Sequence, residues 1–330
     1  MLPELLLSRG RDGAWMTVCA VAGGDSDPAE VRRRAEARIA TISEAALPPL
    51  DPSPTAGVEV RGARPPAAYE HAVAAAVARI RAGEATKLVL AREVTVDASA
   101  AHSVPALYGA LRELFESCFV FCVGTPEADF IGASPELLAR RSGGSAATVA
   151  LAGSARRSAD PAVDDHLGEQ LLRSAKDRHE HAVVAKRIKR RLEPHSVWVE
   201  VAPEPVVIKV ANIQHLATPI RAQLAESRSV LELAGLLHPT PAVGPEPAGA
   251  EGLRAIAELE QLDRGWYAGP VGWMDMAEDG EFCVALRSAL IRDRRAHLFA
   301  GAGIVADSDP GAELAETEIK LGALLPLLAG

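Results

Sequence analysis

Apolar and polar positions repeat along this chain with two different periods, and each period predicts a type of secondary structure. Over residues 67–82 the side chains of Val73, Val77 and Ile80 recur at helical spacing, which predicts an amphipathic helix. Over residues 87–96 the pattern changes to that of a strand. Similar patterns predict a helix over 102–115 and short strands over 118–123, 129–133, 137–141 and 147–151.

The second half of the chain contains longer helical patterns between its predicted strands. We expect one polar helix over residues 164–192, further helices over 229–237, 248–262 and 310–328, and strands over 195–201, 206–210, 281–293 and 297–300. The strands between residues 118 and 151 have connections too short for a parallel crossover, so they must pair antiparallel. Strands grouped together, with helices inserted in blocks, are typical of an α+β fold.

The first part of the chain is followed by a proline-rich stretch. A strand is predicted over residues 15–21 and a charged helix over 27–46, and several prolines follow over 47–57. Proline breaks both helices and sheets, so residues 47–57 are predicted to be a loop or linker. The composition changes too little across this stretch to predict two independent domains. We therefore expect a single domain over residues 1–330.

Composition and charge narrow the class of protein. Hydrophobic residues make up 48% of the 330 residues and charged residues 24%, which is the balance of a globular protein that folds without disulfides or a structural metal. The net charge of −9 argues against a nucleic-acid partner, because phosphate binding favours basic surfaces. The basic run at residues 186–191 is explained by cations placed near the C-terminal end of a helix.

The sequence predicts neither export nor membrane insertion. The four cysteines form no CxxC pair, and they are expected to be free thiols in a reducing compartment. The N-terminal residues lack a basic segment before their short apolar run, and no apolar run approaches the ~18 residues that span a bilayer. We expect a cytoplasmic protein with no membrane partner.

A glycine motif near the C-terminus is similar to a dinucleotide-binding fingerprint. Gly301, Gly303 and Ala306 fit the pattern G-x-G-x-x-A after a predicted strand. That fingerprint must begin a helix inside a βαβ unit, with an acidic residue about 20 positions later. Only 24 residues follow Ala306, which leaves no room for the second strand. The glycines instead predict a backbone that turns sharply or that another group, such as an anionic ligand, approaches closely.

Charged residues near the C-terminus have both a structural and a functional explanation. Asp309 and Pro310 predict a helix start, and the helix then carries Glu313, Glu316 and Lys320 on one face. These charges either stabilise the helix or line a site.

Arg287 is predicted to alternate with small apolar residues on one face of the strand over 281–293, namely Cys283, Ala285, Ala289 and Ile291. A cation in such surroundings needs a carboxylate or phosphate partner, supplied by the protein or by a substrate.

The predicted helix around residues 173–181 carries a second group of charges. Asp177 and Glu180 lie three positions apart, and they either join a surface lattice of ion pairs or belong to a site. His179 and His181 do not share a helix face at ligand spacing, so no zinc site is expected.

Eight short strings, in order, resemble the chorismate-utilising enzymes, and among them the isochorismate synthases of siderophore and menaquinone pathways. They cover about four-fifths of the chain, from residue 67 to the C-terminus, whereas residues 1–60 match nothing. The strings are Lys87-Leu-Val-Leu-Ala-Arg92, Phe130-Ile-Gly-Ala-Ser-Pro-Glu-Leu-Leu138, Leu151-Ala-Gly-Ser-Ala-Arg-Arg157, Ala175-Lys-Asp-Arg-His-Glu-His181, His215-Leu-Ala-Thr-Pro219, Leu237-His-Pro-Thr-Pro-Ala242, Phe299-Ala-Gly-Ala-Gly-Ile-Val305 and Ala315-Glu-Thr-Glu-Ile-Lys-Leu321.

The resemblance implies a fold, a magnesium ion and a set of site residues. The family fold is a single domain of large antiparallel sheets packed together and flanked by helices, here with a catalytic core over residues 67–330. Lys87 matches the base that activates water, and Glu136 matches the acid that protonates the departing hydroxyl. Glu180 and Glu316 match the Mg²⁺ ligands, with Glu313 and Asp177 as nearby carboxylates. The implied substrate contacts are Gly153, Ser154, His215, Ala242, Arg287, Gly301 and Lys320.

Within the family the strings favour an isochorismate synthase, which adds water at C2 of chorismate and removes the C4 hydroxyl reversibly. Aminating relatives either lack the Lys87 base or carry a lysine in a Pro-Ile-Lys-Gly string where this chain has Ala150-Leu-Ala-Gly153, so no glutaminase partner is expected. The alternatives are a salicylate synthase, which also eliminates pyruvate, and a catalytically silent homologue. A monomer or weak dimer is expected. The segment Val243-Gly-Pro-Glu-Pro247 departs from the Gly-rich continuation of its relatives.

Overall fold

The computed structural model describes residues 3–10, 13–41, 51 and 57–330. The chain divides into two compact units, Met1–Pro49 and Leu50–Gly330. The first unit contains a hairpin of β1 (Leu5–Gly10) and β2 (Gly13–Val18), followed by α1 (Pro28–Ala40). The strand predicted over 15–21 therefore begins and ends earlier. Residues 42–46 of the predicted helix and most of the predicted linker lie outside the described residues. The catalytic core predicted at 67–330 lies within the second unit.

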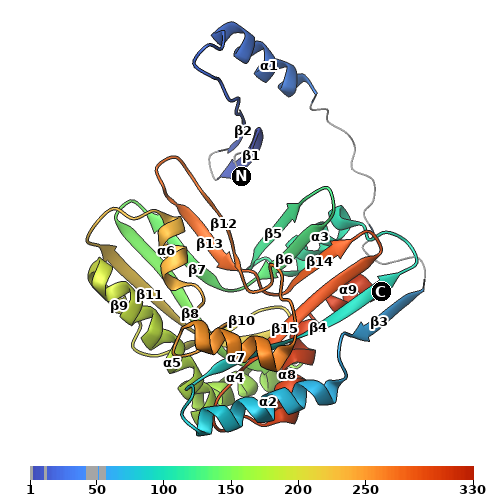
Figure 1. Cartoon of the computed structure of the whole chain (residues 1–330), viewed down its shortest axis with the longest axis vertical. Coiled ribbons are helices and arrows are strands. Elements are labelled where there is room, and N and C mark those ends of the chain that lie inside the picture. The colour runs from blue at the N-terminus through green and yellow to red at the C-terminus, as the bar shows by residue number, and fades with distance from the viewer. Residues whose placement is uncertain (1–2, 11–12, 42–50, 52–56) are drawn as a thin grey trace. The chain divides into compact units, whose positions relative to one another are not determined.

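Two antiparallel sheets form the framework of the second unit (Figure 1). Among the described residues, the first sheet has seven strands in the order β10-β11-β8-β7-β13-β12, with β9 also paired to β11. The second has six strands in the order β3-β4-β15-β14-β6-β5. The strands of the first sheet are β7 (Leu137–Ser142), β8 (Ser145–Arg156), β9 (Ser196–Val201), β10 (Val206–Lys209), β11 (Ile213–Leu224), β12 (Pro270–Met274) and β13 (Gly280–Val284). Those of the second are β3 (Val58–Gly62), β4 (Leu88–Ala98), β5 (Phe119–Gly124), β6 (Asp129–Ser134), β14 (Ser288–Arg292) and β15 (Arg295–Ile304).

Helices flank both sheets, and several of them gather at one end of this unit, the lower end in Figure 1. Helix α5 packs against β8 and β11, α6 against β7 and β13, and α3 against β5 and β6. Helix α8 packs against β15 and α2. The arrangement confirms the predicted α+β fold of large antiparallel sheets flanked by helices. The helices are α2 (Pro66–Arg81), α3 (Val104–Leu114), α4 (Pro161–Arg173), α5 (Ala175–Leu192), α6 (Val230–Leu237), α7 (Ala250–Glu260), α8 (Pro310–Leu321) and α9 (Leu325–Ala329), with a 3-10 turn at Glu193–His195.

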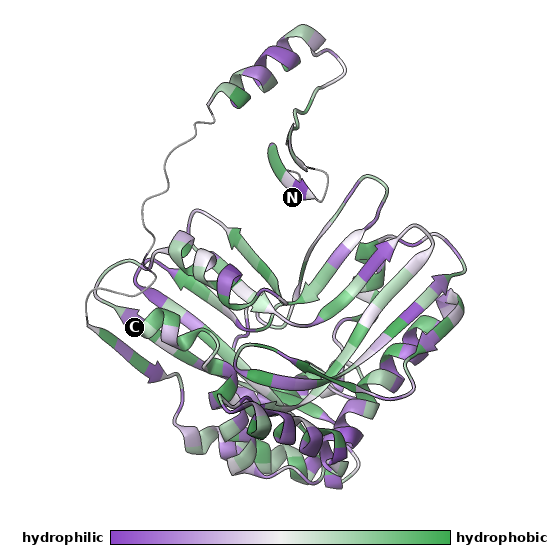
Figure 2. Ribbon diagram, turned by 180° about the vertical axis from the view of Figure 1, so that it is seen from behind, coloured by the Kyte–Doolittle hydropathy of each residue, from purple (hydrophilic) through white to green (hydrophobic). Residues whose placement is uncertain are grey.

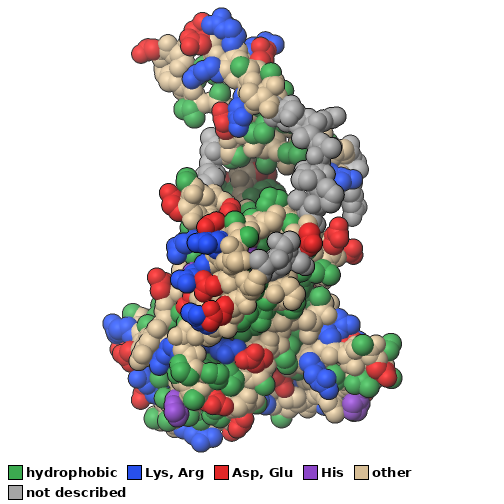
Figure 3. Space-filling model, turned by 90° about the vertical axis from the view of Figure 1, so that its right-hand side faces the viewer, with side chains coloured by type: hydrophobic (Ala, Val, Ile, Leu, Met, Phe, Trp, Pro, Cys, Tyr) green, Lys and Arg blue, Asp and Glu red, His purple; other side chains and the backbone are tan. Residues whose placement is uncertain are grey.

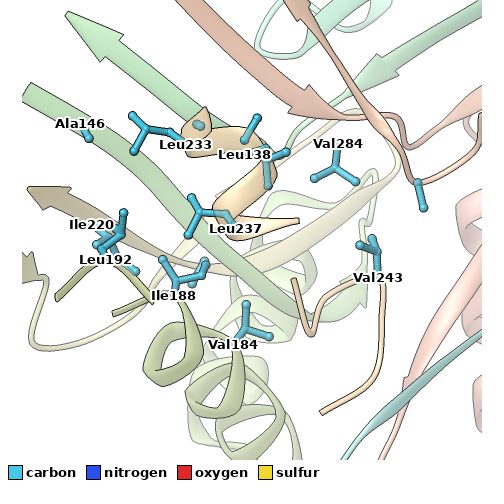
Figure 4. Close-up of a cluster of buried hydrophobic side chains, with 14 of the residues drawn as sticks. Leu138, Ala146, Val184, Ile188, Leu192, Ile220, Leu233, Leu237, Val243 and Val284 are labelled. Atoms are coloured by element: carbon cyan, nitrogen blue, oxygen red, sulfur yellow. The ribbon is translucent and has the colours of Figure 1, made fainter. Parts of the chain in front are cut away.

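The hydrophobic core explains why the helices lie on the sheets. Figure 2 shows hydrophobic positions mainly along the strands, whereas the helices at the lower end carry many hydrophilic ones. In the cluster of Figure 4, Val184 and Ile188 of α5 pack with Ile220 of β11 and with Val243 of the segment after α6. Removing such side chains from water is the main favourable contribution to folding. An apolar stripe of α5 therefore packs on the first sheet.

The single helix predicted over residues 164–192 is wrong, because the chain forms two helices that are separated at Ser174. Ser174 has an extended backbone (φ −64°, ψ 116°), and its hydroxyl accepts a hydrogen bond from the amide of Asp177 as the N-cap of α5. A serine side chain that satisfies a free helical N–H competes with helix continuation. The break places Asp177 and Glu180 in the first turns of α5.

The single strand predicted over residues 281–293 is also wrong. It is two strands, β13 and β14, that belong to different sheets. Between them Arg287 adopts φ 48°, a left-handed conformation that strands do not contain. The expected alternation of Arg287 with Cys283 and Ala289 on one strand face is therefore lost.

One further prediction needs correction, and one strand that carries a site residue was missed. The helix predicted over 310–328 ends at Leu321, and α9 begins at Leu325. Strand β11 was not predicted, although it carries His215. By contrast, Asp309 caps α8 and Pro310 stands in its first turn, as predicted.

The surface of the larger unit carries both signs of charge. On the face seen in Figure 3, Lys and Arg side chains are interspersed with Asp and Glu side chains. Among the described residues, no helix has the length and apolar character to cross a membrane.

Candidate active site

A cleft gathers most of the predicted site residues from distant parts of the chain. It lies where β8, β11 and β15 meet α5 and α8, and two connections between the sheets also reach it. The predicted residues that line it are Glu136, Gly153, Ser154, Glu180, His215, Ala242, Arg287, Glu316 and Lys320. Lys87 lies directly behind Glu180, whereas Gly301, Asp177 and Glu313 are outside the lining.

Glu136 is a buried carboxyl at the connection between β6 and β7, where the chain passes from one sheet to the other. Burial raises the pKa of Glu136 to about 8, although the charges of Lys87 and Arg287 act in the opposite direction. A carboxyl with this pKa keeps its proton at neutral pH, because desolvation disfavours the charged form. Glu136 can therefore donate a proton to a group in the cleft.

Lys87 directly precedes β4, and its side chain is fully buried (0% exposed). Its Nζ lies 2.9 Å from Oε1 of Glu180 on α5, but it makes no hydrogen bond of good geometry within the described residues. The pair brings together a strand and a helix that are about 90 residues apart in the chain. Removing either partner would leave the other charge buried and unpaired, which is costly.

Gly303 of β15 faces this pair, and sequence reasoning did not select it as a site residue. A Cβ atom built at Gly303 would lie 2.2 Å from Glu180 Oε1 and 2.7 Å from Lys87 Cε. The glycine motif at residues 301–303 was the sequence signal that could have identified it. The group that approaches this backbone closely is the Lys87–Glu180 ion pair.

Replacing Gly303 by alanine is expected to lower kcat about 100-fold, because displacement of a reacting group by about 1 Å has that effect. The atoms in the way are the ends of two flexible side chains, so we expect the protein to fold with a smaller change in melting temperature. Gly235→Ala is the matched control, because a Cβ at this exposed position of α6 meets nothing within 4 Å. Equal activity of the Gly303→Ala variant and the wild type would show that catalysis does not depend on the position of the Lys87–Glu180 pair.

Helix α8 contributes one acidic and one basic side chain to the cleft. Lys320 Nζ lies 2.6 Å from Glu316 Oε1 and donates to the carbonyl of Gly301 at 2.8 Å. Burial would raise the pKa of Glu316, but the adjacent Lys320 ammonium holds it below its usual range. Glu316 is therefore a charged carboxylate, and Gly301 contacts Lys320 through its carbonyl.

Arg287 reaches the cleft from the connection between β13 and β14. Its Nη2 donates to Nε2 of His215 at 3.0 Å. Burial lowers the pKa of His215 to about 3, and the charges of Arg287 and Lys320 act in the same direction. The neutral ring therefore accepts at Nε2 and donates from Nδ1 to the carbonyl of Gly153 at 3.2 Å. Within the described residues no carboxylate forms an ion pair with Arg287, so its charge is available for an anionic ligand.

Gly153 occupies a bulge in β8. The pairing between β8 and β11 passes from Ser154–His215 to Ala152–Leu216 and skips Gly153, whose φ is 76°. An added Cβ would also lie 3.2 Å from that of Asp177. Bulges re-aim neighbouring side chains, and this one places Ser154 and His215 on the cleft.

The four predicted metal ligands do not form one cluster. Asp177 accepts a hydrogen bond from the Ser174 hydroxyl, and Glu313 lies 2.6 Å from Lys176 Nζ. In the part of the chain that the structure describes, no three His, Cys, Asp or Glu side chains lie close enough to hold a metal ion. Glu180 and Glu316 do line the same cleft. Two carboxylates suit Mg²⁺, which keeps several waters and takes further oxygens from its substrate.

The segment after α6 supplies contacts that the sequence did not predict. Thr240 is buried, and its hydroxyl lies 3.5 Å from Glu136 Oε1. Ala242, which was predicted, lines the cleft two residues later. The Pro-Thr-Pro-Ala string was the signal for both.

Comparison with known proteins gives consistent matches. Residues 1–329 match the family described as "Chorismate binding enzyme", which includes residues 1–60, where the strings found no match. "Salicylate biosynthesis isochorismate synthase" of Pseudomonas aeruginosa is 43% identical over 277 residues, which are 84% of this chain and 58% of that protein. "Isochorismate synthase MenF" of Bacillus subtilis is 35% identical over 329 residues, 100% of this chain and 69% of that protein.

A solved structure, that of MenF, "the Menaquinone-Specific Isochorismate Synthase from Escherichia Coli", superimposes with a TM-score of 0.87 at 31% identity, over 99% of this chain and 75% of the other. This chain is thus shorter than these relatives, and it spans less than two thirds of the Pseudomonas protein.

Proposed function

Because this chain belongs to the family of chorismate-binding enzymes, we propose that it is an isochorismate synthase that isomerises chorismate reversibly. The observation that carries the proposal is Glu136, a buried carboxyl that remains protonated at neutral pH in a cleft with charged groups of both signs. The names of the relatives support the same activity.

Each step of the proposed reaction has a residue in the cleft. Lys87, acting as the neutral amine, takes a proton from water as the water oxygen bonds to C2 of the ring. The ring double bonds shift, the C4–O bond breaks, and Glu136 gives its proton to the departing hydroxyl, which leaves as water. Arg287 and Lys320 hold carboxylates of the substrate, since guanidinium and ammonium groups bind such anions. The water that enters balances the water that leaves. The proton gained by Lys87 is released and Glu136 is protonated again through solvent, so the net reaction is an isomerisation.

The product assay tests this proposal. Purified protein is incubated with chorismate and Mg²⁺, and the products are separated chromatographically. We expect isochorismate. Salicylate together with pyruvate would assign the chain to the salicylate synthases, and ammonia-dependent aromatic amines to the aminating branch. No turnover would favour a silent homologue. We also propose a cytoplasmic monomer or weak dimer that works without a glutaminase subunit.

We propose Mg²⁺ as the cofactor, held by Glu180 and Glu316, with Asp177 and Glu313 nearby. The bound ion would supply positive charge for a substrate carboxylate. The remaining chemistry belongs to the side chains described above.

Chelation of divalent metal is expected to abolish activity, and added Mg²⁺ to restore it. Glu316→Gln should raise the Mg²⁺ concentration for half-maximal activity at least about 10-fold, and titration calorimetry should show the same weakening without turnover. Glu318→Gln is the control, because Glu318 lies on the same helix but is mostly exposed and pairs with Arg92. Full activity in chelator would exclude a magnesium requirement.

A further inference from the structure

The segment Val243–Pro247, which departs from the family pattern, lies beside Lys87, the proposed base. The amide of Glu246 donates to the carbonyl of Lys87 at 2.8 Å, and the amide of Lys87 donates back at 3.2 Å. The Thr86 amide also donates to the Glu246 carbonyl at 2.8 Å. These bonds form an isolated antiparallel bridge at the start of β4. The backbone of Glu246 therefore holds the backbone of Lys87.

The side chain of Glu246 extends to helix α5. Its two oxygens accept from Arg187 Nη1 at 2.7 Å and from Arg190 Nη2 at 2.8 Å. The side chains of Glu246 and Arg187 are only 12% and 13% exposed, so this contact is shielded from water, and charge-assisted bonds are stronger there. The basic run at 186–191, expected to be a solvated helix end, thus has a specific partner.

Helix α5 also carries the carboxylate that faces the base. Glu180 precedes Arg187 by seven residues, about two helical turns, so both lie on one face of α5. Glu180 Oε1 is the atom 2.9 Å from Lys87 Nζ. The contacts therefore link back on themselves. Backbone hydrogen bonds join Lys87 to Glu246, and an ion pair joins Glu246 to Arg187 of α5. The same helix carries Glu180, which contacts Lys87.

Two neighbouring contacts stiffen the segment. Val243 packs in the same core cluster as Val184 and Ile188 of α5 (Figure 4). Arg264 donates to the carbonyls of Val243 at 2.9 Å and Val89 at 2.8 Å, which ties the segment to β4. The segment is thus attached to both elements that carry the pair.

We propose that Glu246 is a positioning residue that sets the separation of Lys87 and Glu180 by bracing the start of β4 against α5. The inference rests on the proposed function, because Lys87 is assigned there as the base. Within the part of the chain that the structure describes, Lys87 Nζ makes no well-aligned hydrogen bond, so the backbone brace determines where the buried Lys87 side chain lies.

The test compares Glu246→Gln and Glu246→Asp with a matched control, Glu204→Gln. Glu204 pairs with Arg178 of the same helix at 2.9 Å, but both side chains are exposed. We expect Glu246→Gln to lower kcat about 10- to 100-fold with KM little changed, because the base is misplaced while the substrate contacts remain. Glu246→Asp, which keeps the charge, should recover part of the loss, and Glu204→Gln should match the wild type.

Amide hydrogen exchange provides a readout that does not need turnover. In Glu246→Gln, exchange should quicken in the peptide that covers residues 86–90 and stay unchanged in distant strands such as β14. Wild-type kcat in a folded Glu246→Gln protein would overturn the proposal, as would faster exchange over the whole chain, which indicates a merely structural role. If the wild type itself fails to turn over chorismate, the proposed function fails, and the exchange experiment still decides whether Glu246 braces β4.

Discussion

Replacing Lys87 by methionine is expected to lower kcat about 10²- to 10⁴-fold, which is the contribution that a positioned general base makes to a reaction. Methionine has a similar length and no charge, so it keeps the buried volume but cannot accept a proton. The measurement is isochorismate formation at saturating chorismate and Mg²⁺, with KM determined alongside kcat.

The control for this variant has to separate chemistry from folding. Lys87→Met leaves Glu180 without its ammonium partner, and loss of one partner of a buried ion pair costs about 3–5 kcal/mol. Lys87→Met/Glu180→Gln removes both charges and should recover melting temperature but not activity. Lys186→Met, at an exposed position of α5, should match the wild type in both. An active Lys87→Met enzyme would remove Lys87 from the mechanism.

Glu136→Gln is expected to be the second variant with a large loss, again about 10²- to 10⁴-fold in kcat. The amide has the shape of the carboxyl but no acidic proton for the departing hydroxyl. Glu226→Gln, at an exposed position, is the matched control. Retention of activity by Glu136→Gln would assign the proton donor to another group.

The pH profile tests the same residue in the unmodified enzyme. Because the pKa of Glu136 is raised to about 8, the protonated form that donates is present below that pH and disappears above it. Activity should therefore fall as the pH rises through about 8. The residual activity of Glu136→Gln should lack this alkaline limb, whereas Glu226→Gln should keep it. A limb of the same position in Glu136→Gln would mean that another group titrates there.

The two strands at residues 281–293 show what the local sequence pattern could not predict. Their alternating apolar residues predicted one continuous strand, because periodicity reports burial and does not report which sheet supplies it. The chain instead crosses between sheets, and Arg287 stands at the crossing with a left-handed backbone. Glu136 stands at a similar crossing between β6 and β7. Both side chains reach the cleft because the crossings bring them to the junction of the sheets.

Charged residues on helices were ambiguous for a related reason. Glu316 and Lys320 form the ion pair that their spacing predicted, and they also line the cleft, so both explanations apply together. Asp177 and Glu313 have the same sequence character but are held by Ser174 and Lys176. Spacing along one helix cannot distinguish these cases, because the deciding partners come from other elements.

The sequence by itself determined the fold class, the family and most of the residues in the cleft. Local periodicity encodes helices and strands, and ordered strings carry the family resemblance without any coordinates. Only the tertiary structure showed that the pKa of Glu136 is raised and that Gly303 lies against the Lys87–Glu180 pair. It alone also showed that Glu246 links the start of β4 to α5. Each of these features depends on groups that are far apart in the chain. They are the burial of the Glu136 carboxyl, the space left by the absent Cβ of Gly303, and the contacts of the Glu246 carboxylate with two arginines. Only packing brings such groups together.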